Sequence, residues 1–460
     1  MDDKNIAIFS VQGRLYAEVV TRNDQQDRQR LNPALPDENE AKHTDDPDLL
    51  RRSSRASLRA ELYRPKVIQG HSIICFAGED WWYHHPRSKY HLMRRFAKAG
   101  NRVIFVNSIS MGLPSLRNKD LLPRIFRKLR SYARLARATP EGVTVVSPAV
   151  IPFFGSRAAR TVNRKLLAMQ IGRLARRGGL SRPILWIAIP TAADMIGEFD
   201  EQLVIYQVSD KYDANLMDHA TELGTIRKLH ERAIDNADIV LYSGHKLLAE
   251  ADRAFERSFL VEQAVDFNHW SQVGAGDMEV AAAVTSISRP RLGYFGAIEP
   301  WLIDQDLIKC AARERPDWQW IFIGNKSRGV EIEDLPNTHF LPPVPYQQLP
   351  HYAAGFDVCV LPWDTAHSFT SYGSAIKVRE YLATGLPVVI SPLPEYESMG
   401  HVLRIARSND DWFRLVEESL NEKDPAAARA RQSAVSSGTW DARAEFVSGL
   451  IESTLAMKAN

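Results

Sequence analysis

The strongest constraint on the fold is a series of short, nearly continuous apolar runs in the first half of the chain, separated by segments of helix length. Strands that are apolar on both faces and alternate with helices are typical of a parallel sheet covered on both sides. The sequence therefore predicts a doubly wound α/β domain from six such runs, at residues 73–77, 103–107, 143–147, 184–189, 203–208 and 239–242.

The same rhythm restarts after a glycine-containing break at residues 271–290, which looks like a linker. A chain of 460 residues that is 45% hydrophobic can fill two cores. We expect two Rossmann-like α/β domains facing across a cleft, at 67–285 and 286–440, with ligands bound beyond the carboxyl ends of the strands. Residues 441–460 should form a helix that packs back towards the N-terminal domain. The second sheet is predicted from the runs at 292–295, 320–323, 339–341, 358–361 and 388–390.

Residues 1–66 are predicted to form a disordered or poorly ordered tail. From residue 21 to residue 64 the chain is rich in Asp, Glu, Arg, Asn and Gln and poor in aromatic residues, so burial cannot offset the entropy of ordering it. The apolar run at residues 6–11 has two interpretations, an added strand or docking peptide and a poorly ordered terminus.

The composition of the chain limits its expected partners and cellular location. The formal net charge of +2, from 58 basic and 56 acidic residues, gives no polyelectrolyte signal, so no nucleic-acid partner is expected. Cys75, Cys310 and Cys359 are far apart and lie in apolar runs, which indicates buried thiols in a reducing compartment. No uninterrupted apolar run reaches the roughly 18 to 20 residues of a membrane-spanning helix, and no signal-peptide pattern is visible. We therefore expect a cytoplasmic protein.

The most informative stretch is residues 371–389, which predicts one short helix leading into a buried strand. Ser374 is expected to cap the helix and Gly385 to end it. A helix N-terminus that faces a cleft favours anions through its unpaired N–H groups and its dipole, and Lys377 adds a full positive charge there.

Lys377, Glu380 and Tyr381 are spaced to share one face of this helix. A cation for a diphosphate, followed one turn later by a carboxylate for ribose hydroxyls, favours a nucleoside-diphosphate site. The alternative is that Lys377 and Glu380 form an ordinary solvated pair.

The pattern Lys-x-x-Glu-Tyr-Leu-Ala-x-Gly-x-Pro-Val-Val, starting at Lys377, resembles the nucleotide-sugar helix of bacterial group 1 glycosyltransferases. The resemblance covers nearly all of residues 70–455 and implies a GT-B fold, an acceptor bound mainly by the N-terminal domain and no metal or other cofactor. Further matching segments are 264–266, 293–298, 321–324, 344–350 and 356–362. The donor-binding candidates implied in the C-terminal domain are Gly296, Tyr346, Ser374, Lys377, Glu380 and Tyr381.

One departure from the family pattern concerns stereochemistry. Retaining, family-4-like members carry a second Glu eight positions before the ribose-binding Glu, and here that position is Tyr372. The resemblance then points to the divergent exopolysaccharide, teichuronic-acid and glucuronosyltransferase-like branch, and both retention and inversion stay open.

Two acidic side chains that follow N-domain strands are candidates for the general base, Asp210 after 203–208 and Asp80 after 73–77. A base must reach the acceptor hydroxyl, so the end of a strand at the cleft suits either. Asp210 is favoured because related inverting enzymes place an Asp in such a run. The alternative is that Asp210 caps the next helix.

The loop at residues 78–87 is dense in aromatic, His and charged residues. Aromatic faces stack on sugar rings while polar groups bind hydroxyls, so this loop is a candidate acceptor site. Neighbouring His84 and His85 cannot easily face one metal ion, so no metal site is expected. The acceptor-binding candidates are Glu79, Trp81, Trp82, His85 and Arg87.

Two basic segments lie in the predicted acceptor domain. Residues 117–138 carry eight basic side chains against Asp120, and residues 157–182 carry eight against none. Basic amphipathic helices are typical of peripheral attachment to an anionic membrane surface. The alternative is a pair of ordinary surface helices with arginine-rich exteriors.

Together these features predict a glycosyltransferase that moves a sugar from a nucleoside-diphosphate sugar to a saccharide acceptor, expected to be lipid-linked, in bacterial surface or exopolysaccharide biosynthesis. It would act at the inner face of the cytoplasmic membrane. Two alternatives use the same fold: a nucleotide-sugar 2-epimerase, and a catalytically inactive binding or scaffold protein.

Overall fold

The computed structural model describes residues 4–11, 14–21, 67–83, 85–107, 136–151, 156–212, 223–251, 254–332, 334–367 and 370–459. Near the N-terminus, β1 (Lys4–Val11) and β2 (Arg14–Thr21) pair as an antiparallel hairpin in which Val11 opposes Arg14. The expected tail therefore begins with two strands, one of which contains the apolar run at 6–11. Residues 22–66 lie outside the described part of the chain.

The N-terminal domain contains an eight-stranded sheet in the order β10-β9-β8-β7-β3-β4-β6-β5. Every neighbouring pair is parallel except β5 and β6. All six predicted apolar runs form strands of this sheet, which confirms the predicted fold class. The strands are β3 (Ser72–Phe76), β4 (Arg102–Val106), β5 (Ala136–Ala138), β6 (Val143–Val146), β7 (Ile184–Ile187), β8 (Leu203–Val208), β9 (Ile239–Tyr242) and β10 (Ser258–Leu260).

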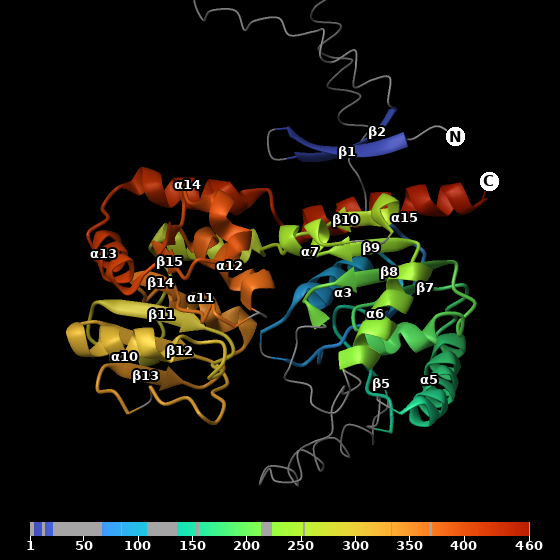
Figure 1. Cartoon of the computed structure of the whole chain (residues 1–460), viewed down its shortest axis with the longest axis horizontal. Coiled ribbons are helices and arrows are strands. Elements are labelled where there is room, and N and C mark those ends of the chain that lie inside the picture. The colour runs from blue at the N-terminus through green and yellow to red at the C-terminus, as the bar shows by residue number, and fades with distance from the viewer. Residues whose placement is uncertain are drawn as a thin grey trace, which may run out of the picture. The chain divides into compact units, whose positions relative to one another are not determined.

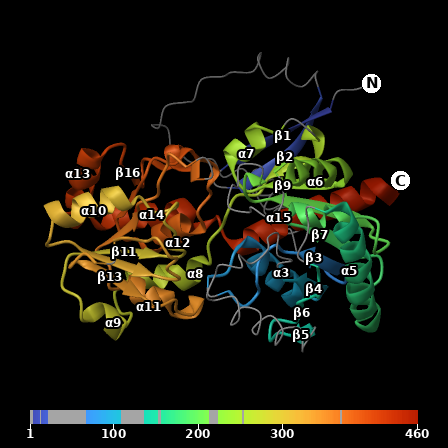
Figure 2. The same ribbon diagram turned by 60° about the horizontal axis from the view of Figure 1, so that its bottom comes forward.

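Alternate side chains of the central strand β3 enter two separate cores, because successive residues of a strand point to opposite faces. Ile74 and Phe76 belong to one core, and Ile73 and Cys75 to the other. Helices cover both faces, as Figures 1 and 2 show. The helical segments of this domain are α3 (Ser88–Lys98), α5 (Arg157–Arg177), η1 (Pro190–Met195), α6 (Leu223–Asn236), α7 (His245–Ala249) and η3 (Phe255–Arg257).

The C-terminal domain has a six-stranded parallel sheet in the order β13-β12-β11-β14-β15-β16. Its strands are β11 (Arg291–Phe295), β12 (Gln319–Ile323), β13 (Thr338–Leu341), β14 (Val358–Leu361), β15 (Val388–Ile390) and β16 (Arg404–Ile405). Its helical segments are α8 (Phe267–Trp270), η4 (Ser271–Ala275), α9 (Ala282–Thr285), α10 (Gln305–Glu314), η5 (Tyr346–Gln348), α11 (Leu349–Ala353), η6 (Thr370–Tyr372), α12 (Ile376–Thr384), η7 (Pro394–Met399), α13 (Asn409–Leu420) and α14 (Pro425–Ser436).

The chain passes from one domain core to the other at Ala264 and Val265, which are buried in the N- and C-terminal cores respectively. This crossing lies earlier than the predicted boundary at 285/286. The segment expected to be a linker, 271–290, contains η4 and α9, whose Val273 and Val284 pack into the C-terminal core. Apolar side chains within this glycine-containing stretch thus tie it to the second sheet.

The last helix, α15 (Trp440–Ala459), returns to the N-terminal domain and runs along it in Figure 1. Trp440, Val447 and Ile451 are buried with the strands of that domain, and the backbone N–H of Ile68 donates to Oγ of Ser448 at 3.1 Å. The second crossing of the chain between the domains is therefore anchored by burial on the N-terminal side.

Candidate functional site

Side chains from both domains meet where the loop after β3 faces the N-terminal part of α12. The Nε2 atom of His85, in that loop, lies 3.2 Å from Oε2 of Glu380 on α12. The His85 ring also meets the ring of Phe295, the last residue of β11, edge to face at 5.6 Å. The carboxyl ends of β3 and β11 and the helix α12 thus surround one site, as expected for parallel sheets.

Lys377 is the central cation of this site. Its side chain is buried, and its Nζ donates one hydrogen bond, 2.9 Å long, to the hydroxyl of Tyr294. The ammonium also faces the rings of Tyr294 and Trp363, at 4.3 Å and 5.4 Å. Among the described residues, no carboxylate lies within ion-pair distance of it. Burial lowers the pKa of Lys377 to about 7, against the pull of Glu380 and with the help of Arg87.

Backbone approaches Lys377 closely at the end of β11. Gly296 has a φ of +129°, and a Cβ atom at this position would lie 2.3 Å from Nζ of Lys377. Any other residue would therefore clash with the ammonium as well as strain the chain. The sequence motif beginning at Gly293 is explained here, because Gly296 keeps open the space beside the cation.

Glu380 is fully buried one turn further along α12. Its Oε2 faces His85, and its Oε1 has no hydrogen-bond partner among the described residues. A buried carboxylate oxygen without a donor is costly, which marks the position as one that a ligand hydroxyl could satisfy. The Glu380 side chain has no solvent-exposed surface, and the His85 ring lies against its Oε2.

Two predicted donor contacts are structural instead. Tyr381 is fully buried, and its hydroxyl accepts the backbone N–H of Phe295 at 3.2 Å, which holds the end of β11 against α12. Tyr346 is also buried and accepts a hydrogen bond from Nε1 of Trp270 at 2.9 Å. Burial, and next the Glu380 carboxylate, raise the pKa of Tyr346. Tyr381 therefore supports the site from within the core, and Tyr346 forms its buried floor beside Glu380.

The expected cap of α12 is wrong. The helix begins at Ile376, so its N-cap is Ala375, whose side chain makes no capping bond, and Ser374 lies one residue further out. The end of the helix is as predicted, because Gly385 adopts a φ of +79°. The backbone N–H groups of the first turn thus have no side-chain cap.

In the loop at 78–87, the acceptor candidates Trp81 and Glu79 are both buried, and the assignment of Trp81 is corrected. Trp81 is 4% exposed and packs edge to face on Phe105, so its ring cannot stack on a sugar. Oε1 of Glu79 accepts the backbone N–H of Tyr90 at 3.1 Å, in the first turn of α3, and its other oxygen lies 3.6 Å from Nζ of Lys89. Glu79 therefore fixes the loop to the helix, and it also lines the pocket that contains His85 and Arg87.

The remaining loop residues are accessible. Trp82 is 52% exposed, Arg87 is exposed at the N-cap of α3, and both are available to a ligand. Arg87 and His85 line a pocket of about 170 Å³ together with Asp80. Oδ1 of Asp80 accepts the backbone N–H of Trp82 at 3.0 Å, so this carboxylate stabilises the turn of the loop.

Asp210 lies just beyond the carboxyl end of β8, in a second pocket of about 320 Å³ that also contains Lys211, His230 and Glu250. Residues 213–222, between Asp210 and α6, lie outside the described part of the chain, so the alternative that Asp210 caps the next helix stays open. No hydrogen bond to its carboxylate is formed within the part of the chain that the structure describes. Asp210 is therefore better placed than Asp80 to accept a proton from a ligand in its pocket.

Tyr372 occupies the position at which the family pattern has its second Glu, and it forms a contact between the domains. Its hydroxyl donates to the Glu250 carboxylate, at 2.9 and 3.0 Å from the two oxygens. Nζ of Lys211 lies 2.9 Å from the same carboxylate, and Nζ of Lys246 sits 4.1 Å over the Tyr372 ring. A carboxylate of the N-terminal domain is thus held beside the position that lacks one.

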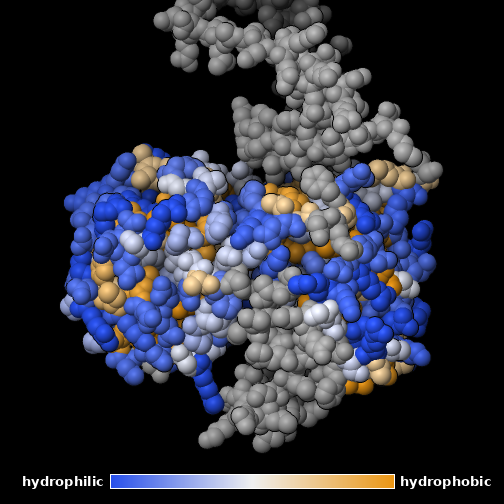
Figure 3. All heavy atoms as spheres, in the orientation of Figure 1, coloured by the Kyte–Doolittle hydropathy of each residue, from blue (hydrophilic) through white to orange (hydrophobic). Residues whose placement is uncertain are grey.

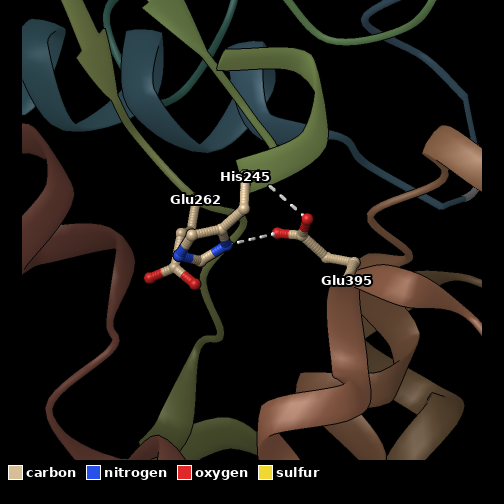
Figure 4. Close-up of side chains that lie close together, drawn as sticks. All are labelled: His245, Glu262 and Glu395. Atoms are coloured by element: carbon tan, nitrogen blue, oxygen red, sulfur yellow. Dashed lines mark hydrogen bonds and ion pairs between the residues drawn. The ribbon is translucent and has the colours of Figure 1, made fainter. Parts of the chain in front are cut away.

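A third polar cluster joins the domains near α7, where His245, Glu262 and Glu395 come together (Figure 4). Glu395 accepts the backbone N–H of His245 at 2.9 Å, and its hydrogen bond to the ring raises the pKa of His245. These residue types can hold a metal ion, but Glu262 already binds Arg379 at 2.6 Å and Arg443 at 2.9 Å. A cation here would meet two guanidinium groups, so the cluster is better described as an ion-pair network between the domains.

The basic segment 117–138 lies outside the described residues except for its last three, which form β5. The segment 157–182 contains α5, whose apolar residues Leu167 and Ile171 are buried in the N-terminal core. Its apolar face is therefore unavailable to a membrane, contrary to the expected interfacial helix. Only Val162 and Met169 remain as large exposed apolar side chains of α5. Figure 3 shows a largely hydrophilic surface on that side of the molecule.

Residues 289–420 match the family described as Glycosyl transferases group 1. A curated relative, TuaH of Bacillus subtilis (strain 168), carries the assignment of a teichuronic acid biosynthesis glycosyltransferase and is 28% identical over 236 residues. That match covers 47% of this chain and 57% of TuaH, so the chain spans little more than half of this relative.

Solved structures show the same fold at low identity. Sucrose-phosphate synthase from Thermosynechococcus elongatus has a TM-score of 0.61 at 13% identity and covers 85% of this chain and 100% of its own. The catalytic domain of starch synthase IV from Arabidopsis thaliana, bound to ADP and acarbose, has a TM-score of 0.56 at 10% identity, with 85% and 100% covered. Anabaena HepE, in complex with UDP and glucose, has a TM-score of 0.54 at 12% identity, with 84% and 99% covered.

Residues 289–420 of this chain are thus similar to group 1 glycosyltransferases, and the chain has the GT-B fold. The sequence candidates that the fold brings together are Lys377, Glu380, Gly296, His85 and Arg87, which come from both domains. Asp210 occupies a separate pocket on the N-terminal side.

Three residues of the candidate site were not predicted from the sequence. Tyr294 and Trp363 form the walls around the Lys377 ammonium, and Glu250 meets Tyr372 across the domains. Tyr294 lies in the segment 293–298, which resembles the family pattern, so its aromatic ring could have been predicted to line the site. Nothing local distinguishes Glu250 from other exposed acidic residues.

In the part of the chain that the structure describes, no helix combines the length and apolar character needed to span a bilayer.

Proposed function

We propose that this chain transfers a glycosyl group from a nucleoside-diphosphate sugar, bound on the C-terminal domain, to a hydroxyl of a saccharide acceptor bound on the N-terminal domain. The observation that carries the proposal is the buried Lys377 ammonium beside Gly296, without a carboxylate partner among the described residues. A buried cation without a counterion is costly unless a ligand supplies the negative charge. The diphosphate supplies it, and Glu380 binds the ribose one turn away.

The transfer needs one proton acceptor and one stabilised leaving group. The acceptor hydroxyl gives its proton to the Asp210 carboxylate while its oxygen bonds to the anomeric carbon of the sugar. The bond from that carbon to the diphosphate oxygen breaks, and the electron pair stays on the nucleoside diphosphate. Lys377 binds the negative charge that develops there. No residue in this scheme requires a metal ion or another cofactor.

The similarity to TuaH supports a role in the synthesis of a bacterial surface polysaccharide. GT-B relatives bound to UDP or ADP support a nucleotide as the donor moiety. We propose a saccharide acceptor carried on a lipid, so that the enzyme works peripherally at the cytoplasmic face of the membrane. The arginine-rich exterior of α5 and the residues that follow it support this location.

The deciding experiment follows the fate of the donor. Purified protein is incubated with UDP-, GDP- and dTDP-sugars, with and without a lipid-linked saccharide acceptor, and the products are separated by chromatography. Transfer predicts release of nucleoside diphosphate that depends on the acceptor. An epimerised donor formed without acceptor would establish a 2-epimerase, and donor binding without any turnover would establish an inactive scaffold.

Replacing Glu380 with Gln is expected to raise the donor KM about three- to tenfold, because a charged hydrogen bond contributes roughly 1.5 to 3 kcal/mol and the amide recovers part of it. The control is His85→Ala, which removes the same contact between the domains from its other end. If Glu380 serves only that contact, the two variants will behave alike. Steady-state kinetics with donor varied at saturating acceptor measures the difference.

Donor binding is expected to take up a proton above neutral pH. The pKa of Lys377 is about 7 in the ligand-free protein, and a bound diphosphate favours the charged form and so raises it. Affinity should be constant with respect to this group below pH 7 and fall as the pH rises above it, by up to tenfold per pH unit. Calorimetry at pH 8 in buffers of different ionisation enthalpy measures the uptake, and Lys377→Gln should abolish it. Proton release on binding would contradict the assignment.

Binding to anionic vesicles is expected to depend on the exposed end of α5. Arg173, Arg176 and Arg177 form no ion pair within the described structure, and each basic residue near such a surface contributes on the order of 1 kcal/mol. Changing all three to Gln should weaken co-sedimentation with phosphatidylglycerol vesicles by about tenfold or more. The matched control removes three exposed cations of the C-terminal domain, namely Arg313, Arg328 and Arg429. Equal losses in both variants would argue against docking through α5.

A further inference from the structure

Arg87 differs from the other cations of its helix. At the N-cap of α3 it has extended backbone and an exposed side chain, and no carboxylate within the described residues pairs with it. By contrast, Lys89 lies 3.6 Å from Glu79, and Arg95 binds Asp441 at 2.8 Å. The charges of Lys89 and Arg95 are therefore used inside the protein, whereas that of Arg87 is directed at the pocket it lines.

The pocket of Arg87 opens beside the donor site on the other domain. His85, two residues earlier in the chain and lining the same pocket, touches Glu380, which is one helical turn from Lys377. Burial lowers the pKa of Lys377, and the charge of Arg87 adds to this effect while Glu380 opposes it, so the two cations lie within range of each other's charge. Two cations from different domains, neither in ion-pair contact with a carboxylate of the described residues, thus lie near the unpartnered Oε1 of Glu380.

We propose that Arg87 is a donor ligand supplied by the N-terminal domain: its guanidinium and the ammonium of Lys377 bind the same diphosphate from opposite walls. This inference rests on the proposed function and moves Arg87 from the acceptor to the donor. A guanidinium suits the role because it can bind two phosphate oxygens at once. During transfer, the electron pair of the broken bond between sugar and diphosphate comes to rest on an oxygen that both cations neutralise.

Placing one cation on each domain makes leaving-group stabilisation depend on the arrangement of the domains. Lys377 alone can hold the donor on the C-terminal domain. Arg87 reaches the diphosphate only when the N-terminal domain, which carries the acceptor, is in place. The charge needed for bond breaking is then complete only when both substrates are enclosed, which protects the donor from hydrolysis.

The test is a double-mutant cycle with Arg87→Ala, Lys377→Ala and the double variant, read by calorimetry. The probes are the tightest-binding member of a panel of UDP, GDP, dTDP and ADP, the corresponding nucleoside, and inorganic diphosphate. Arg87→Ala should weaken binding of the nucleoside diphosphate roughly 10- to 100-fold and leave the nucleoside unaffected. The losses from the two single variants should not multiply, because both side chains bind one group. Arg87→Lys keeps the positive charge but cannot bind two phosphate oxygens at once. Its affinity for the nucleoside diphosphate should lie between those of the parent protein and Arg87→Ala.

Lys98→Ala is the matched control, since it removes an exposed cation from the other end of α3. If this variant loses as much affinity as Arg87→Ala, the effect is one of general charge and the proposal is wrong. If Arg87→Ala binds the diphosphate normally but has a raised KM for the acceptor, Arg87 belongs to the acceptor. In either case a loss in Lys377→Ala would keep the proposed function, whereas no diphosphate binding by the parent protein would overturn the function itself.

Discussion

Replacing Lys377 with Met is expected to weaken donor binding strongly and, at the same time, to make the protein more resistant to heat. The ammonium is buried among the rings of Tyr294 and Trp363 with a single hydrogen bond to a neutral hydroxyl. Met has a similar length and suits an apolar cavity. The Tyr294 hydroxyl stays satisfied in the variant, because it still donates to the carbonyl of Ala297 at 2.7 Å. The variant therefore loses a desolvated charge without leaving a polar group unpaired.

The gain in stability should depend on pH. The pKa of Lys377 is about 7 in the folded protein against 10.5 for the ordinary side chain, so the unfolded chain binds more protons between these values. Stability of the parent protein should therefore rise with pH across this interval, as far as Lys377 is concerned. The advantage of the Met variant in thermal unfolding should be largest at or below pH 7 and should shrink towards pH 10.

Donor affinity in Lys377→Met should fall roughly 10- to 100-fold, the loss expected for one charged hydrogen bond to the diphosphate. Lys98→Met is the control for changing an exposed Lys to Met elsewhere. A Lys377→Met protein that kept full donor affinity would show that the cation serves packing alone. A variant that was less stable than its parent at pH 7 would contradict the account of a costly buried charge.

The strands could be predicted because a strand that is buried on both faces consists almost entirely of apolar residues. Every residue of β3 and β8 is buried, and such runs are recognisable without knowing what covers them. The turn residue Gly385 was found for the same reason, since its positive φ is a local requirement. Properties of this kind do not depend on distant partners.

The roles of individual side chains were harder to predict, because they depend on partners far away in the chain. Trp81 and Trp82 are neighbours in sequence, yet one is buried against Phe105 and the other is half exposed. The contact between His85 and Glu380 joins residues 295 positions apart. No spacing rule could predict it, and the burial of Glu380 argues against the alternative of a solvated pair with Lys377. Only the packing of the two domains decides which polar residues face the site.

Asparagine in place of Asp210 is expected to leave donor affinity intact and to reduce the rate of transfer about 100- to 10,000-fold, the usual contribution of a general base. The amide has the shape of the carboxylate but cannot accept the hydroxyl proton. Asp210 lies in the N-terminal pocket beyond β8, whereas the donor ligands Lys377 and Glu380 are on α12. The Asp210→Asn variant should therefore have an unchanged Kd for nucleoside diphosphate and a reduced kcat.

The matched control for Asp210→Asn is Asp80→Asn, which makes the same change at the other candidate base. Oδ1 of Asp80 accepts the backbone N–H of Trp82, and the amide oxygen of Asn can accept the same bond, so the loop at 78–87 should keep its conformation. If Asp80 only stabilises this turn, the Asp80 variant will retain most of its activity. The opposite result, with normal turnover in Asp210→Asn and a large loss in Asp80→Asn, would move the base to the loop after β3. In that case the acceptor hydroxyl would be deprotonated from the pocket that Arg87 lines.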